Sequence, residues 1–141
     1  MEPIDLSGLP ERALLLLDSA PIIYVLEDHP RLASRFLPLF EAHGVDAVRF
    51  AVSTITIAEV LCGPIQARDD ALARRYRGIL ESWQVVDLTA DVAESAARLR
   101  GPLRLKLPDA VQVASALGIN ADALVTHDRD FSNVRALRII S

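Results

Sequence analysis

The sequence has few of the residues on which several classes of protein depend. Its only cysteine, Cys62, excludes an internal disulfide and a thiolate metal cluster, and its neighbours in IAEVLCG predict that it packs in the core. The three histidines are far apart and show no spacing typical of a zinc site. The longest aliphatic runs, such as ALLLL at 13–17, are far shorter than the roughly 20 residues that span a bilayer. We therefore expect no membrane contact.

The first residues, MEPIDLSGLPER, carry acids and prolines where a secretory signal needs a basic end followed by an apolar run. This pattern indicates a cytoplasmic protein. A length of 141 residues predicts one domain, which buries about two-thirds of its unfolded surface in a single core.

The formal net charge of −4 at first sight argues against a nucleic-acid partner, because binding to a polyanion depends on clustered Lys and Arg. This argument from net charge is weaker if bound cations neutralise a cluster of acids, because the rest of the chain is then close to neutral. All but one of the 15 basic residues are Arg, which grips a phosphate through two donors at once. They form two groups, each either a phosphate contact or a solvated helix face: Arg68, Arg74, Arg75 and Arg77, and Arg98, Arg100, Arg104 and Lys106.

Extended and helical patterns alternate along the chain. We expect strands at 13–18, 47–53, 83–88, 121–128 and 134–141, and helices at 20–29, 31–44, 54–64, 67–82, 90–100 and 105–117. Ser19 is expected to cap the first helix, and the pairs Gly63-Pro64 and Gly101-Pro102 to end two others. Interleaved strands and helices predict an α/β fold, with a mainly parallel sheet flanked by helices in three α/β/α layers.

Four acids stand in unusual places. Asp18 follows the aliphatic run ALLLL, and Asp128 follows the run ALVT of another predicted strand. Both acids should therefore emerge at the carboxyl edge of the sheet, where ligands collect. Asp109 starts an apolar helix and shares its inner face with residues four and eight positions later. Glu59 lies in the middle of a mostly apolar helix.

Taken singly, each acid has an ordinary explanation: Asp109 as a helix cap, Asp18 and Asp128 as turn residues, and Glu59 on a solvent stripe. Taken together they indicate a site. Clustered carboxylates repel one another and need a positive partner, and Mg²⁺ or Mn²⁺ takes oxygen ligands. Such ions activate water and neutralise a phosphate, so hydrolysis of phosphodiester bonds is the chemistry that fits best.

Four blocks in this order, LLLLDSAPIIY, VSTITIAEVLCGP, LKLPDAVQVASAL and LVTHDRDF, resemble the PIN domain, in particular the VapC toxins of toxin–antitoxin pairs. The resemblance runs from about residue 13 to the end of the sequence. It implies a metal-dependent endoribonuclease that forms a homodimer and is inhibited by a cognate antitoxin occupying its groove. The family's acids correspond to Asp18, Glu59, Asp109 and Asp128, the positions reached above from the residues alone.

The chain departs from the family pattern at several points. Ser19 and then Ala20-Pro21 stand where the family often has Asn or another polar residue after the first acid, and His127 stands where Asn is frequent. Asp130 competes with Asp128 as the fourth acid, and the nearer strand exit favours Asp128. Residues 1–12 extend beyond the usual start of the domain, which we assign to 13–141; they are either a flexible tail or a contact specific to this protein.

We expect Asp18, Asp109 and Asp128 to hold Mg²⁺ or Mn²⁺, with Glu59 as a further ligand or as the base that orients water. Ser19 and Thr126 are candidate hydrogen-bond partners of these acids. Arg104 and Lys106, just before Asp109, are either contacts to RNA phosphates or surface charges. The helices within 20–43 could supply a dimer face, although we favour a core role for them.

Three other functions remain open. A PIN-like module without turnover could act by binding RNA or a partner protein. A solitary PIN nuclease would need no antitoxin. A phosphatase with Asp18 as its covalent nucleophile is disfavoured, because enzymes of the haloacid dehalogenase type carry a second Asp two positions on, where this chain has Ala20.

Overall fold

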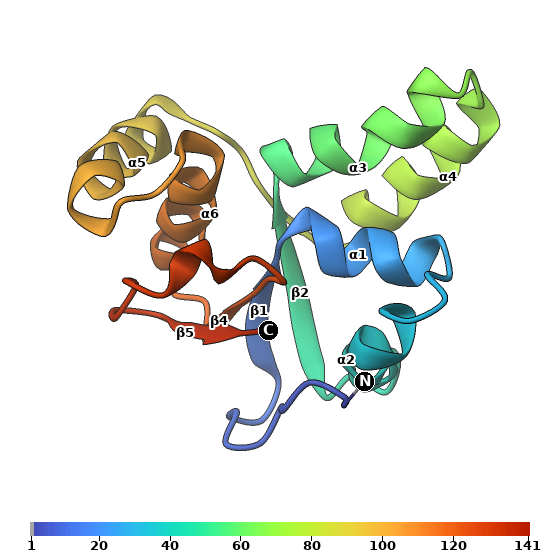
Figure 1. Cartoon of the computed structure of the whole chain (residues 1–141), viewed down its shortest axis with the longest axis horizontal. Helices are drawn as coiled ribbons and strands as arrows, with labels where there is room; N and C mark the ends of the chain where they lie inside the picture. Colours follow the sequence, from blue (N-terminus) through green and yellow to red (C-terminus); the bar gives the residue numbers. More distant parts are fainter. Residues whose placement is uncertain (1) are drawn as a thin grey trace.

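The computed structural model describes residues 2–141 and has a parallel sheet at its centre, as expected (Figure 1). The strand order is β3-β2-β1-β4-β5, and each neighbouring pair is parallel. The strands are β1 (Ala13–Leu17), β2 (Val48–Ser53), β3 (Gln84–Val86), β4 (Ala123–Val125) and β5 (Arg138–Ile140). The first two strands along the chain pair with each other, and β4 then adds on the other side of β1.

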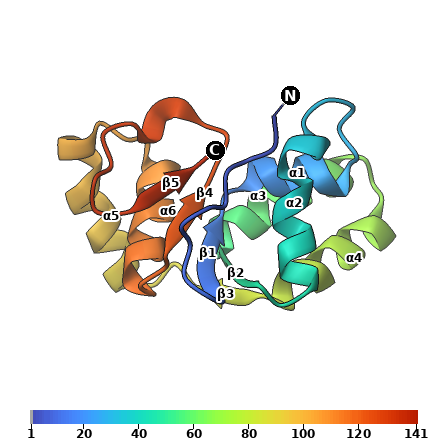
Figure 2. The same ribbon diagram turned by 90° about the horizontal axis from the view of Figure 1, so that it is seen from below.

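Helices cover both faces of this sheet (Figure 2). On one face lie α1 (Ser19–Leu26), α2 (Ala33–Gly44), α3 (Thr54–Gln66) and α4 (Asp70–Glu81); on the other lie α5 (Ala90–Leu103) and α6 (Leu107–Gly118). A 3-10 helix, η1 (Arg129–Phe131), follows β4. The three-layer α/β/α arrangement expected from the alternating pattern is confirmed.

The central strand β1 explains why its sequence is an unbroken aliphatic run. Leu15 and Leu17 pack in the hydrophobic cluster under α1 to α4, whereas Leu14 and Leu16 pack in the cluster under α5 and α6. Successive side chains of a strand point to opposite faces, so a strand covered on both faces is apolar throughout. Each leucine buried in this way stabilises the fold by about 2 kcal/mol.

Three predicted helix boundaries are wrong. Asp18, and not Ser19, occupies the cap position of α1, and its carboxylate accepts a hydrogen bond from the Ser19 amide. Helix α3 continues through Gly63-Pro64 to Gln66, and α5 continues through Gly101-Pro102 to Leu103. Each proline lies in the last turn of its helix. A proline removes one backbone hydrogen bond, and this loss matters less in the last turn, because helix ends fray.

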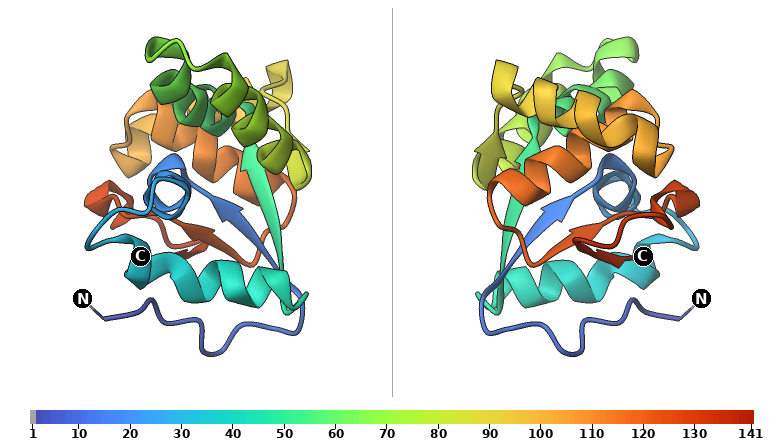
Figure 3. Two further views of the ribbon diagram at one scale, coloured as in Figure 1. Left: turned by 90° about the vertical axis from the view of Figure 1, so that its right-hand side faces the viewer. Right: turned by 90° about the vertical axis from the view of Figure 1, so that its left-hand side faces the viewer.

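Residues 2–12 lie alongside α2 (Figure 3). Ile4 is only 6% exposed and packs in the same hydrophobic cluster as α2, and its amide donates to the Arg35 carbonyl at 3.1 Å. Cys62 is exposed, so the prediction that it packs in the core is wrong: it lies on the outer face of α3. Among residues 2–141, no helix combines the length and apolar character needed to cross a bilayer.

Candidate metal centre

The carboxyl ends of β1 and β4 bring Asp18 and Thr126 together. The two strands are neighbours with Leu17 opposite Val125, and the Asp18 amide donates to the Val125 carbonyl at 2.8 Å. The Thr126 hydroxyl donates to Oδ2 of Asp18, also at 2.8 Å. Thr126 therefore orients the first acid, in the role expected for it, while its own oxygen accepts the Asp128 amide at 3.0 Å.

Gln112, which the sequence reasoning did not select, holds the other oxygen of Asp18. Its Nε2 donates to Asp18 Oδ1 at 3.2 Å and to Thr56 Oγ1 at 2.6 Å, and its Oε1 accepts from Ser53 at 2.9 Å. Gln112 is 1% exposed and Asp18 is 9% exposed. The signal was present, because Gln112 is one of two polar residues in an apolar helix and lies one turn after Asp109.

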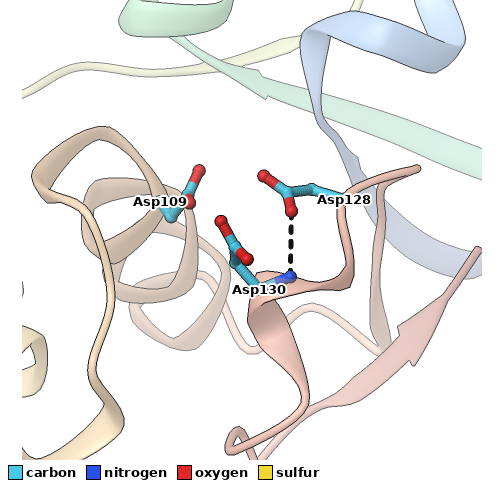
Figure 4. Close-up of side chains that lie close together, drawn as sticks. All are labelled: Asp109, Asp128 and Asp130. Carbon is cyan, nitrogen blue, oxygen red and sulfur yellow. Dashed lines mark hydrogen bonds between the residues drawn. The ribbon is translucent and has the colours of Figure 1, made fainter.

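Three carboxylates form a cluster beside this network (Figure 4). One oxygen from each of Asp109, Asp128 and Asp130 lies within 4.8 Å of the others. Asp109 comes from the first turn of α6, whereas the other two come from the loop after β4 and from η1. The Asp130 amide donates to Oδ1 of Asp128 at 2.9 Å and fixes the spacing of that pair. The structure thus brings Asp130 to the cluster together with Asp128.

Asp109 has the most perturbed environment of these acids. Burial, then the negative charges of Asp128, Asp18 and Asp130, raise its pKa to about 6, and Lys106 offsets this only in part. Within residues 2–141, its Oδ2 is a buried side-chain oxygen without a hydrogen-bond partner. A buried carboxylate oxygen that lacks a donor and lies among other carboxylates is placed as a ligand of a cation would be.

Glu59 and Asp18 border this cluster and lie outside its 4.8 Å limit. Burial, followed by the charges of Asp18 and Asp109, raises the pKa of Glu59, while a hydrogen bond from Ser19 lowers it. Ser19 therefore lies beside two of the predicted acids: its amide donates to Asp18, and its side chain lowers the pKa of Glu59. Glu59 is therefore close enough to feel the charges of Asp18 and Asp109, and the charge of Asp18 in turn raises the pKa of Asp109.

The two basic residues before α6 differ in position. Lys106 Nζ lies 3.7 Å from Oδ2 of Asp130, with both side chains largely exposed. Arg104 ends α5 in a left-handed conformation, with φ 53°, and its side chain is exposed. Lys106 is therefore next to the acids, whereas Arg104 forms the turn between the two helices.

The donor set suits a hard divalent cation. Carboxylate oxygens are the ligands that Mg²⁺ and Mn²⁺ prefer, and no histidine or thiolate belongs to the cluster among the residues described. A cation there would give the buried Oδ2 of Asp109 the partner that it lacks and would cancel the repulsion that raises the pKa of that residue.

Comparison with known proteins agrees with this architecture. The family model of the PIN domain matches residues 15–137, and the chain belongs to this family. Several solved structures share its fold. A chain of a toxin–antitoxin complex from Klebsiella pneumoniae has a TM-score of 0.72 at 25% identity, over 90% of this chain and 96% of that one.

Two more distant neighbours share the fold. A chain of VapBC2 from Rickettsia felis, bound to a DNA fragment from its promoter, has a TM-score of 0.69 at 21% identity, over 89% of this chain and 96% of that one. VapC20 from Mycobacterium tuberculosis, a toxin that cleaves the sarcin–ricin loop, has a TM-score of 0.66 at 18% identity, over 86% and 98%. Comparison with curated protein sequences finds no match.

Proposed function

We propose that this PIN domain is a divalent-metal-dependent endoribonuclease and the toxin of a type II toxin–antitoxin pair. The observation that carries the proposal is the trio Asp109, Asp128 and Asp130 at the carboxyl edge of the sheet, with a buried Asp109 oxygen that no donor in residues 2–141 satisfies. The neighbour from Klebsiella pneumoniae is part of a toxin–antitoxin complex, and VapC20 cleaves an RNA loop.

The trio would hold Mg²⁺ or Mn²⁺ with Asp18 beside it, and Glu59 would act as a further ligand or as the base that orients water. When bound, the cation would supply charge neutralisation at the phosphate and an activated water. The protein's own part is positioning. Gln112 and Thr126 hold both oxygens of Asp18, so this carboxylate enters the site in one orientation without a reorganisation cost.

Glu59 is suited to handle a proton. Its pKa is raised toward neutral pH relative to that of an ordinary glutamate, which favours a role as general base for a water near the acids. The nearby Ser19 side chain lowers this pKa in part. Asp18 is held by three uncharged donors, the Ser19 amide and the side chains of Gln112 and Thr126.

The partners follow from the same proposal: RNA as the substrate, a cognate antitoxin as the inhibitor and a second copy of the chain in a homodimer. Two neighbours come from structures described as a toxin–antitoxin complex and as VapBC2, which supports the antitoxin. A small reading frame beside the gene, encoding a DNA-binding protein with an extended tail, is the genetic observation expected.

An RNA cleavage assay with Mg²⁺ or Mn²⁺, repeated with a chelator, tests the proposal. We expect fragments only with the metal, and a loss of at least about 100-fold in Asp109→Asn, the order of effect of removing one charge-stabilising group. The matched control is Asp46→Asn. Asp46 precedes β2 at the opposite edge of the sheet, and its φ of 61° is a conformation that Asn tolerates.

Full activity in Asp109→Asn, or fragments in the presence of the chelator, would contradict the metal-dependent nuclease. Binding of RNA without any fragments would instead identify a catalytically silent PIN module. Both variants are compared at equal folded concentration, established by thermal unfolding.

A further inference from the structure

The loop after β4 has two chemically different faces. Its even-numbered residues, Thr126, Asp128 and Asp130, bond to one another on the side of the acid cluster. Its odd-numbered residues, His127 and Arg129, line a separate cavity of about 290 Å³. The loop thus divides the carboxyl edge of the sheet into an acidic side and a basic side that are one residue apart.

Arg35 lines the basic side from α2 and is held in place. Its two terminal nitrogens donate to main-chain oxygens of Glu2 and Ser141. Its guanidinium carbon lies 5.9 Å from the centre of the Phe36 ring. A guanidinium anchored by main-chain oxygens and a ring loses little conformational entropy when it binds a ligand.

His127 is also fixed in orientation. Its Nδ1 is 3.1 Å from the Tyr24 hydroxyl, and its ring packs edge-on against Tyr24 and Phe36, with ring centres 5.5 Å and 5.6 Å apart. With Nδ1 engaged, Nε2 is the ring nitrogen left to contact a ligand. The cavity wall is therefore built from Arg35 and His127, which are both half-buried, and from the exposed Arg129.

Arg129 supplies the free positive charge of this cavity, because the terminal nitrogens of Arg35 already donate to main-chain oxygens of Glu2 and Ser141. Neither Arg35 nor Arg129 belongs to the ion pairs found among residues 2–141. A free guanidinium beside an anchored one suits a phosphate, because a single guanidinium can donate two parallel hydrogen bonds to its oxygens. Free phosphate and a phosphate of an RNA backbone offer the same oxygens to this cavity. The position of the cavity must therefore decide which of the two it binds.

The position favours RNA. His127 and Arg129 flank Asp128 in the chain, so a strand that presents one phosphate to the acids runs past this cavity with another. The acid cluster by itself repels a polyanion, and a basic pocket beside it supplies attraction where the chain most needs it. We propose that the cavity lined by Arg35, His127, Arg129 and Ser141 binds a backbone phosphate of RNA next to the bond that is cut, which rests on the proposed nuclease function.

Arg129→Gln tests the pocket, because Arg129 is exposed and none of its side-chain atoms has a hydrogen bond within residues 2–141. The probe is a fluorescein-labelled single-stranded oligouridylate in chelator, where nothing is cut, and anisotropy is measured over a range of salt. We expect Kd to rise about tenfold at low salt, as for a lost hydrogen bond to a charged group. The slope of log Kd against log salt should fall by about 0.7, the value for one phosphate contact on a single strand.

Two further variants bracket this result. Arg129→Lys keeps the charge and should keep the slope. Arg12→Gln, at the opposite edge of the sheet beside Asp46, should leave both Kd and slope unchanged. In the cleavage assay, Arg129→Gln should raise KM and leave kcat within about twofold, because a contact made equally in the ground and transition states changes binding alone.

Unchanged Kd and slope in Arg129→Gln would overturn the proposal. So would a pocket specific for free phosphate, seen as a rise in Tm with inorganic phosphate that Arg129→Gln abolishes while RNA affinity stays the same. Failure of the nuclease function is a separate outcome, because it is the absence of fragments in the wild type with metal, whereas the salt slope is measured without metal.

Discussion

The carboxyl edge of the sheet holds two acids in opposite environments. Both oxygens of Asp18 accept hydrogen bonds, from Thr126 on one side and from Ser19 and Gln112 on the other. Asp109 has a buried oxygen without a partner and a pKa raised to about 6. The protein thus supplies hydrogen-bond donors to both oxygens of the first acid, whereas among residues 2–141 it leaves one oxygen of the second without any. This difference indicates that the fold itself fixes the orientation of Asp18, whereas Asp109 has an oxygen available to bind a ligand.

The largest effects should come from making the same substitution at both acids. Asp18→Asn and Asp109→Asn should each reduce cleavage by at least about 100-fold. Their effects on stability without metal should have opposite signs. Asp18→Asn should destabilise the fold by about 1–3 kcal/mol, because an amide nitrogen then faces hydrogen-bond donors, whereas Asp109→Asn should stabilise it.

Urea unfolding in chelator measures the two stability changes, and Asp46→Asn serves again as the control. Equal signs for the two variants would contradict the contrast between the acids, even if both variants lost cleavage. Undiminished cleavage in both would refute their assignment to the site.

Gln112 tests whether the hydrogen bonds to Asp18 matter. Gln112→Leu has a similar volume but removes the donor to Asp18 and Thr56 and the acceptor for Ser53. We expect a loss of about 2 kcal/mol in the free energy of unfolding, together with a fall in kcat that exceeds any change in KM. Ser115→Ala is the matched control, a buried polar residue of the same helix, and it should change kcat by less than about twofold. A kcat equal to that of the wild type would remove the positioning role.

The pH dependence of stability should reveal Asp109 in the protein without metal. Its pKa is about 6 in the folded state and 3.8 for an unperturbed aspartate, so the folded state binds the proton more tightly. The contribution of this group to stability is therefore greatest below about pH 4 and is lost as the pH rises through about 6. Allowing for screening by water at this half-exposed group, the loss is about 1 kcal/mol.

Urea unfolding at several pH values checks this. The unfolding free energies of the wild type and Asp109→Asn should differ most above pH 6, the folded pKa, and converge near pH 4, the pKa of an unperturbed aspartate. A difference between them that does not change with pH would show that Asp109 has an ordinary pKa.

The smallest expected difference is between the two loop acids. Asp130 is exposed and lies near Lys106, whereas Asp128 is held by the Thr126 hydroxyl and the Asp130 amide. Asp128→Asn should therefore weaken Mn²⁺ binding by about tenfold and Asp130→Asn by less, the range typical of losing one ligand or its supporting bond. Titration calorimetry with Mn²⁺ measures both. The reverse order would make Asp130 the main ligand.

Much of the fold was predictable because its signals are local. Strand β1 is an aliphatic run buried on both faces, and Asp18 and Asp128 follow β1 and β4 as the pattern indicated. The predicted helix ends at Gly63-Pro64 and Gly101-Pro102 were wrong, because the position of a proline within the last turn is not visible in sequence. Cys62 was wrongly assigned to the core for a related reason: an apolar run of a helix includes its outer face.

The sequence by itself determined the order of strands and helices along the chain, the parallel sheet and the edge at which the acids emerge. Periodicity and the ends of strands depend on neighbours in the chain. Only the tertiary structure decided that Gln112 holds Asp18, that Asp130 joins Asp109 and Asp128, and that Arg35 faces His127 and Arg129. The physical reason is that hydrogen bonds and charge clusters depend on distances of a few ångströms between segments far apart in sequence, and these distances are set only when the helices pack on the sheet.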